Sequence, residues 1–256
     1  MEIDEAIQKT IEYAGKFGMK LNKEQLWLRL MGSRVFLREE FDKASIRTKL
    51  TQQEPANIEI EKKMLETQKM IEEIVLGDKN ILMAAVTGSV AAENCRKSDD
   101  IDILIVTREN RLWWCRLKLL FFLIKNKYKF RRHGRKEKGN EFCFNMWMEE
   151  KSLKIPVEKQ NERSAVDLIL LKVLIDRNNI YDNFLRKNNW AKKWVATGYN
   201  LKSKNQKSKS LKAKENKKNI TGDVVNLLAF VGQYIYMLPK ITKETVKLRS
   251  AFFHIT

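Results

Sequence analysis

The sequence is poor in cysteine, proline and glycine, and each scarcity excludes a class of protein. Among 256 residues there are three cysteines, three prolines and ten glycines. The cysteines, at positions 95, 115 and 143, are odd in number and widely spaced, so they suggest neither a disulfide framework nor a zinc-binding pattern. The few prolines and glycines argue against a turn-rich all-β protein and favour long helices. We therefore expect a helix-rich protein of a reducing cytoplasm.

Long apolar runs are also missing. The longest lies near residue 120, reads LKLLFFLI and is interrupted by Lys118, which makes it too short to span a bilayer. Residues 1–20 alternate charged and apolar side chains, unlike a secretory signal peptide. We expect a cytoplasmic protein with no membrane partner.

Negative charge is scarce relative to positive charge. The chain has 50 Lys and Arg residues against 32 Asp and Glu, a formal net charge of +18 that favours polyanionic partners such as RNA, DNA or nucleotides. Residues 201–219 hold eight lysines, one glutamate and no hydrophobic periodicity, which predicts a disordered linker or a basic arm. Residues 125–140 form a second basic stretch, either a solvated loop or one that steers anions to a site. A lysine-rich composition can also reflect the base bias of a genome, which needs no function.

The most informative stretch is residues 83–106, MAAVTGSVAAENCRKSDDIDILIV. Its two apolar runs, residues 83–86 and 103–106, are typical of buried strands. Gly88 and Ser89 follow the first run, where a strand gives way to small residues that suit the start of a helix. A backbone of this kind can approach a phosphate closely and direct free N–H groups toward it.

Asp100 and Asp102 stand at the start of the second run. Because side chains alternate along a strand, both carboxylates point to one face while Ile101 and Ile103 point to the core. Two adjacent carboxylates repel each other unless a cation lies between them, and Mg²⁺ prefers such hard oxygen ligands. A phosphate cradle beside a paired-carboxylate metal site is what phosphoryl or nucleotidyl transfer requires. The plainer alternative is an ordinary turn followed by an acidic strand start.

Gly88-Ser89, ten intervening residues and Asp100-Ile101-Asp102 together resemble the signature of the polymerase-β-like nucleotidyltransferase superfamily. A wider likeness, over residues 3–200 and again near the C-terminus, is to prokaryotic proteins that join a winged-helix-like segment to a nucleotidyltransferase domain. The resemblance implies an α+β fold: a nucleotidyltransferase-type mixed sheet flanked by helices, an N-terminal helical, winged-helix-like segment and C-terminal helices. It also implies an NTP donor and two Mg²⁺ ions, with Asp100 and Asp102 as catalytic metal ligands and Gly88 and Ser89 as nucleotide-binding residues.

In this superfamily a third carboxylate commonly lies on a later strand beside the pair. Residues 141–148, EFCFNMWM, are the strand candidate here, and the matching position is Asn145. Asn145 can bind Mg²⁺ through its amide oxygen but cannot accept a proton from a nucleophile as a carboxylate would. Glu141 shares a strand face with Asn145 and is the second candidate to complete the metal shell.

Breaks in the hydrophobic pattern divide the chain into four parts. They are a helical, winged-helix-like segment (1–57), a nucleotidyltransferase domain with helical cover (58–200), the Lys-rich linker (201–219) and C-terminal helices (220–256). Amphipathic patterns predict helices over residues 3–17, 23–31, from 37, 58–76, 112–124, 164–175, 181–194, 224–238 and from 243. The first part carries cations that could enter a DNA groove, or it could be a helical cap whose cations are solvated. These cations are Arg34, Arg38, Lys43, Arg47 and Lys49.

Two functions of different classes follow. The first is a Mg²⁺-dependent nucleotidyltransferase that moves an NMP from an NTP to an unknown acceptor. The second is a catalytically weak or inactive protein of the same fold that binds nucleotide or nucleic acid, because Asn145 replaces the third acid. A third hypothesis is a regulator or toxin–antitoxin component whose N-terminal helices read DNA.

Overall fold

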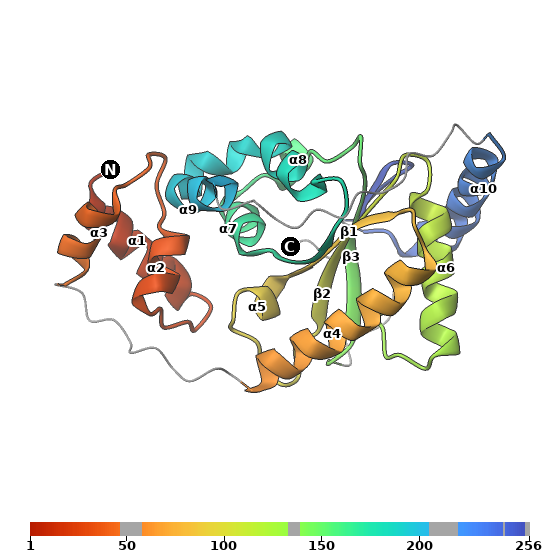
Figure 1. Ribbon diagram of the computed structural model, residues 1–256, viewed down its shortest axis with the longest axis horizontal. Coiled ribbons are helices and arrows are strands. Elements are labelled where there is room, and N and C mark those ends of the chain that lie inside the picture. Colours follow the sequence, from red (N-terminus) through yellow and green to blue (C-terminus); the bar gives the residue numbers. More distant parts are fainter. Residues whose placement is uncertain (47–57, 133–138, 205–219, 243, 254–256) are drawn as a thin grey trace. The chain divides into compact units, whose positions relative to one another are not determined.

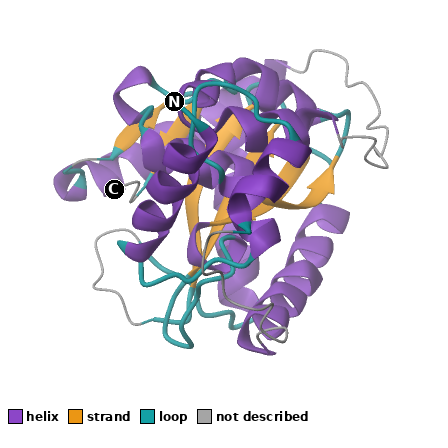
Figure 2. Ribbon diagram, turned by 90° about the vertical axis from the view of Figure 1, so that its left-hand side faces the viewer, coloured by secondary structure: helices purple, strands orange, loops and turns teal. Residues whose placement is uncertain are grey.

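The computed structural model describes residues 1–46, 58–132, 139–204, 220–242 and 244–253. The named strands gather in one sheet, and most of the other described elements are helices (Figure 2). Contacts divide the chain into two compact units. Unit 1 comprises Met1–Asn57, Ile155–Leu170 and Leu185–Ser208, and unit 2 comprises Ile58–Lys154, Leu171–Phe184 and Lys209–Thr256. No helix in the described ranges is both long enough and apolar enough to cross a membrane.

Unit 2 is built on a six-stranded mixed sheet of order β4-β1-β2-β3-β6-β5. The β2–β3 pair is parallel, and the other neighbouring pairs are antiparallel. The strands are β1 (Ile81–Thr87), β2 (Ile101–Thr107), β3 (Phe142–Glu149), β4 (Lys172–Asp176), β5 (Thr245–Lys247) and β6 (Ser250–Phe252). The helices are α4 (Ile58–Gly77), α5 (Gly88–Ala91), α6 (Leu112–Lys125) and α10 (Ile220–Met237), with the 3-10 turn η3 (Leu238–Lys240). The expected α+β class, a mixed sheet flanked by helices, is confirmed.

The central strands are buried on both faces. All seven residues of β1 are buried, and in β2 only Asp102 keeps partial exposure. Helices α4 and α6 pack into the same apolar core as these strands, through residues such as Ile71 and Trp113 (Figure 1). The partly exposed residue of an otherwise apolar strand is therefore a carboxylate at its start.

Most of the predicted elements of unit 2 are confirmed. The apolar runs at residues 83–86 and 103–106 lie within β1 and β2, and residues 141–148 correspond to β3. The helices predicted over residues 58–76, 112–124 and 224–238 are α4, α6 and α10. Their patterns are long and regular, so local sequence was enough to identify them.

The helix predicted over residues 164–175 is wrong in its second half. Helix α7 (Glu162–Leu170) ends early, and the next residues form β4. Strand β4 pairs antiparallel with β1, with Ile175 opposite Ala84. Because an apolar run alone does not distinguish a helix from a buried strand, only the need of β1 for a second neighbour decides the outcome.

The helix predicted from residue 243 is also wrong. Strands β5 and β6 form an antiparallel pair there, and β6 pairs in turn with β3. Phe252 lies opposite Met146, and the backbone N–H of Phe253 donates to the carbonyl of Asn145 at 2.7 Å. These bonds pair the backbone groups at the edge of β3. The local sequence of β3 does not indicate which segment supplies this pairing.

Unit 1 is helical. Its elements are α1 (Ile3–Gly15), α2 (Lys23–Arg29), α3 (Arg38–Ser45), η1 (Val157–Lys159), α7, η2 (Asn189–Ala191) and α9 (Lys192–Lys204). The three N-terminal helices are confirmed, and their core includes Ile7, Leu26 and Phe41. Asn22 begins α2 through a reciprocal capping box with Gln25. A wing would fall on residues 50–57, which lie outside the described residues.

The helix predicted over residues 181–194 is broken in two. Helix α8 (Ile180–Lys187) ends before Asn188, whose buried side-chain oxygen accepts from the Ile155 N–H at 2.8 Å and from Trp190 Nε1 at 3.0 Å. Helix α9 then continues to Lys204. Residues 201–204, predicted as the start of the linker, are therefore helical, and residues 205–219 lie outside the described part of the chain.

Unit 1 is expected to lose stability as pH rises, through Asp167 of α7. Burial raises the pKa of Asp167 from 3.8 to about 6, and the nearby Arg163 opposes this rise only in part. The folded chain therefore holds a proton that the unfolded chain releases between pH 4 and 6, so the stabilisation present at low pH is lost as pH passes 6. Asp167→Asn should unfold at a higher temperature than wild type at pH 7 and at a similar temperature at pH 4. Thermal unfolding across this range is the measurement.

The exposed Asp4 offers a control for Asp167, because Asp4→Asn changes the charge of the same unit equally. Across this pH range, the unfolding temperature of Asp4→Asn should differ from that of wild type by a constant amount. An Asp167→Asn curve that also runs parallel to wild type would contradict the assignment.

Candidate functional site

The turn from β1 into α5 depends on one glycine. Gly88 has a φ of +66°, a conformation that L side chains rarely adopt. A Cβ added to Gly88 would overlap Oδ2 of Asp102. The register of β1 and β2 explains this proximity, because Thr87 lies opposite Asp102. The structure therefore brings the predicted glycine turn and one of the predicted acids into direct contact.

Ser89 follows this glycine and lies in the first turn of α5. It is partly exposed, and its carbonyl oxygen accepts from the Asn94 N–H at 2.9 Å. Glu93, which precedes Asn94, adopts a φ of +60°, so the chain reverses direction within a few residues. The backbone after Gly88 thus forms a tight, partly open loop next to the Asp102 carboxylate.

Asp100, the second acid, is held by the segment that precedes β3. Its Oδ1 accepts from the Glu141 N–H at 2.9 Å, and its Oδ2 lies 3.8 Å from Arg131 Nη1. Both side chains of the ion pair are largely buried, with exposed fractions of 14% for Arg131 and 12% for Asp100. Glu141, the second candidate ligand, contacts Asp100 through its backbone N–H.

Asn145 lies beside Asp102, as the sequence predicted. Its Nδ2 donates to Asp102 Oδ1 at 2.9 Å, across the parallel pairing of β2 with β3. Its Oδ1 is buried and has no hydrogen-bond partner among the described residues. A buried amide oxygen without a partner is costly, so Asn145 has one acceptor available for a ligand.

Two residues that the site depends on were not singled out by sequence reasoning. Lys63 of α4 is buried, and its Nζ donates to the carbonyls of Arg96 at 3.0 Å, Lys97 at 3.2 Å and Asp99 at 2.5 Å. These bonds fasten the loop that leads to the acid pair. The sequence feature that could have identified Lys63 is its position on the apolar side of an amphipathic helix. The second residue, Arg131, was noticed only as part of a basic stretch.

The neighbouring Cys143 is not suited to act as a nucleophile. Burial raises the pKa of its thiol, and the adjacent Asp102 carboxylate raises it further. The thiol is therefore protonated at neutral pH, and a thiol is a far weaker nucleophile than a thiolate. The chemistry available at the site is that of its oxygen donors.

The oxygen donors fit a magnesium ion better than a transition metal. The described residues hold no group of three or more His, Cys, Asp or Glu side chains that could bind a metal. Asp100, Asp102 and the unpartnered amide oxygen of Asn145 supply two carboxylates and a neutral oxygen. Mg²⁺ is usually bound by one or two carboxylates together with substrate phosphates and water, so these oxygen donors are of the chemical type that it prefers.

No protein-family model, curated protein or solved structure matches this chain. The geometry brings Gly88, Asp102 and Asn145 into contact, with Ser89 next to Gly88 in the chain. Asp100 lies two residues from Asp102 and is tied to the start of β3. The proposed function therefore rests on the chemistry of these residues.

Gly88→Ala should destabilise the chain by about 1–3 kcal/mol, because it combines a strained positive φ with overlap against the Asp102 carboxylate. The measurement is urea unfolding. Gly77→Ala is the matched control, since a Cβ there meets nothing within 4 Å, and it should leave stability nearly unchanged or slightly raised. Equal stabilities for the two variants would show that the close contact at Gly88 is absent.

Proposed function

We propose that the chain is a Mg²⁺-dependent nucleotidyltransferase that moves an NMP from an NTP to an acceptor. The observation that carries the proposal is the contact between the Gly88 turn and the Asp102 carboxylate, with Asp100 on the same strand start. A phosphate group beside that turn would lie next to Asp102, two residues from Asp100, which is the arrangement that nucleotidyl transfer needs. The proposal includes a nucleotidyltransferase-type sheet, which is compatible with the observed strand order.

Each residue of the site has a definite task in this proposal. Asp100 and Asp102 hold the metal, and the backbone N–H groups after Gly88, with the Ser89 hydroxyl, bind the triphosphate. Bound Mg²⁺ would supply charge neutralisation on the phosphates and would lower the pKa of an attacking hydroxyl. Asn145 orients Asp102 through its amide N–H and offers its other oxygen as a ligand.

Arg131 has a separate electrostatic task. Its guanidinium lies 3.8 Å from Asp100 Oδ2 and balances part of the negative charge of the pair. Its five N–H donors can also turn to a phosphate oxygen, because arginine recognises phosphates and carboxylates with the same fork of donors. We expect Arg131 to exchange partners when a nucleotide binds.

A second candidate function is nucleotide or nucleic-acid binding without turnover. Asn145 favours it, because an amide cannot take the proton of an attacking hydroxyl as a carboxylate can. The basic balance of the chain, +18 overall, would supply contacts to a polyanion. The proposed winged-helix-like role of residues 1–57 belongs with this candidate, since three described helices there could contact DNA.

Asp100→Asn and Asp102→Asn should each lower activity by about 100-fold or more, because each removes a charged metal ligand. The assay is Mg²⁺-dependent release of pyrophosphate and self-labelling with each α-labelled NTP. Asp99→Asn is the matched control and should stay active, because the Asp99 side chain accepts from the Arg96 N–H in the preceding loop. Full turnover in Asp100→Asn would disprove the transferase. Nucleotide binding by wild type without pyrophosphate release would favour the second candidate.

Asn145→Asp tests the metal site by a measurement that needs no acceptor substrate. A third carboxylate beside Asp102 should lower the unfolding temperature in EDTA, through like-charge repulsion, and Mg²⁺ should raise it more than in wild type. The control is the double variant Asn145→Asp/Asp102→Asn, which exchanges the two groups and keeps the number of carboxylates. An Asn145→Asp variant as insensitive to Mg²⁺ as the control would contradict a metal at this position.

A further inference from the structure

A second pocket lies in unit 2 between α6, α10 and residues 130–132. Its volume is about 440 Å³, within the range of sites for small organic molecules. Apolar side chains form most of its wall, among them Leu117, Leu120 and Phe130. Three arginines, Arg116, Arg131 and Arg132, also line it. Arg116 and Arg131 are partly buried in this apolar wall, where a charge is costly unless an opposite charge balances it.

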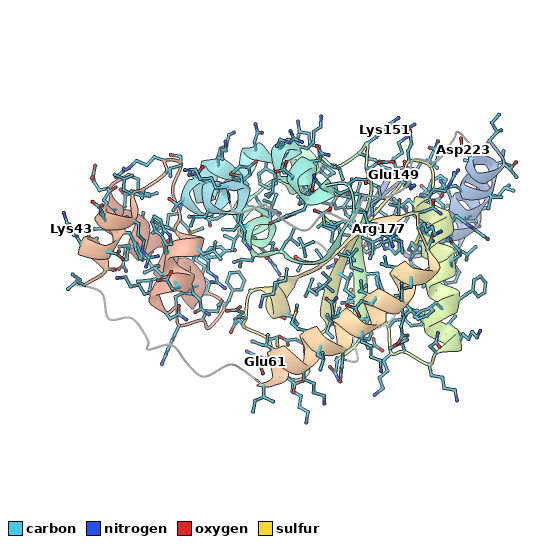
Figure 3. The ribbon with its side chains drawn as sticks, viewed as in Figure 1. Lys43, Glu61, Glu149, Lys151, Arg177 and Asp223 are labelled. Atoms are coloured by element: carbon cyan, nitrogen blue, oxygen red, sulfur yellow. The ribbon has the colours of Figure 1, made fainter. Side chains whose placement is uncertain are left out.

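Polar contacts fix helix α10 against α6, and several of them lie near the start of both helices. Asp223, labelled in Figure 3, pairs with Arg111 at 2.7 Å. The side chain of Asn226 accepts from the backbone N–H groups of Trp113 at 2.9 Å and Trp114 at 3.1 Å. These contacts close the start of α6 and hold α10 in register along it.

Gly232 keeps the α10 wall of the pocket open. It lies inside a helix, where glycine costs about 1 kcal/mol relative to alanine. A Cβ added there would meet nothing within 4 Å. Because Gly232 also lines the pocket, a larger side chain there has open space at the pocket wall.

Arg116 is the charge that most needs a partner. Its guanidinium donates to Gln233 Oε1 and lies 5.0 Å from the ring of Phe253. Burial lowers the pKa of Arg116 to about 10, and it forms no ion pair with any described residue. Neutral contacts of this kind satisfy the N–H donors but leave the charge uncompensated, so an anion in the pocket would be attracted to it.

The other two arginines extend the positive field. Arg132 lies 5.3 Å over the ring of Phe130, at the exposed rim. Arg131 lies in the same wall, and its Nη1 is 3.8 Å from Asp100 Oδ2. A cavity of about 30 Å³ adjoins the pocket and shares Arg116 and Arg131 with it.

We propose that this pocket binds an organic anion, with its carboxylate, sulfonate or phosphate group on Arg116 and Arg131 and its apolar body between α6 and α10. The apolar wall selects against inorganic anions, which offer it no surface to bury. The arginines select against neutral and cationic molecules. The proposal does not depend on nucleotidyl transfer, although Arg131 belongs to both sites.

The test uses two fluorescent probes with the same aromatic rings. 8-Anilinonaphthalene-1-sulfonate carries an anionic group, and N-phenyl-1-naphthylamine is its uncharged counterpart. Arg116→Met should weaken binding of the sulfonate at least tenfold and change binding of the neutral probe less than twofold, because methionine keeps an apolar stem in the wall. Gly232→Leu should weaken both probes, because it fills the pocket. Arg96→Met, which alters an exposed arginine outside the pocket, should change neither.

The full-length chain is used throughout, and thermal unfolding verifies that each variant folds. Equal binding of the sulfonate to wild type and Arg116→Met, or to wild type and Gly232→Leu, would overturn the proposal, because the probe would then be bound elsewhere on the apolar surface. Failure of wild type to bind the sulfonate would also overturn it. If Arg116→Met does not fold, Gly232→Leu decides the question alone, since its site has free space.

Discussion

The close approach of the β1–α5 turn to the Asp102 carboxylate is the constraint on which the site depends. It requires a residue without a Cβ at position 88, because any other would overlap the carboxylate. It also requires the register that sets Thr87 opposite Asp102. A shift of one residue would carry the Asp102 carboxylate away from the turn and to the opposite face of a strand whose other residues are all buried, so burial of the sheet disfavours any other register.

The rest of unit 2 holds the acid pair in place from several directions. Lys63 fastens the loop before Asp100 through three carbonyl oxygens, and the start of β3 donates a backbone N–H to Asp100. Asn145 binds Asp102 from the adjacent strand. The acids are thus restrained by neutral donors and one arginine. Donors of this kind lower the cost of holding the two negative charges, in keeping with either candidate function.

Arg131 connects the acid pair with the pocket between α6 and α10. It contacts Asp100 next to the sheet, and it lines the pocket together with Arg116. A guanidinium can serve only a limited number of anions in one geometry, so an anion in the pocket and a carboxylate on the sheet would share it.

The sequence by itself determined the central strands, the long helices and the glycine turn followed by the acids, because local patterning and the period of two express them directly. It also indicated Asn145 as the neighbour of the pair, through the resemblance to a family motif. Only the tertiary structure decided that residues 172–176 form β4 and that residues 245–252 form β5 and β6. Strand β4 pairs with the free edge of β1, and β6 pairs with that of β3. The tertiary structure alone also placed Lys63 beneath the loop and Arg131 on Asp100. Those contacts join segments tens of residues apart, and no local pattern encodes which distant carbonyl or carboxylate a cation will meet.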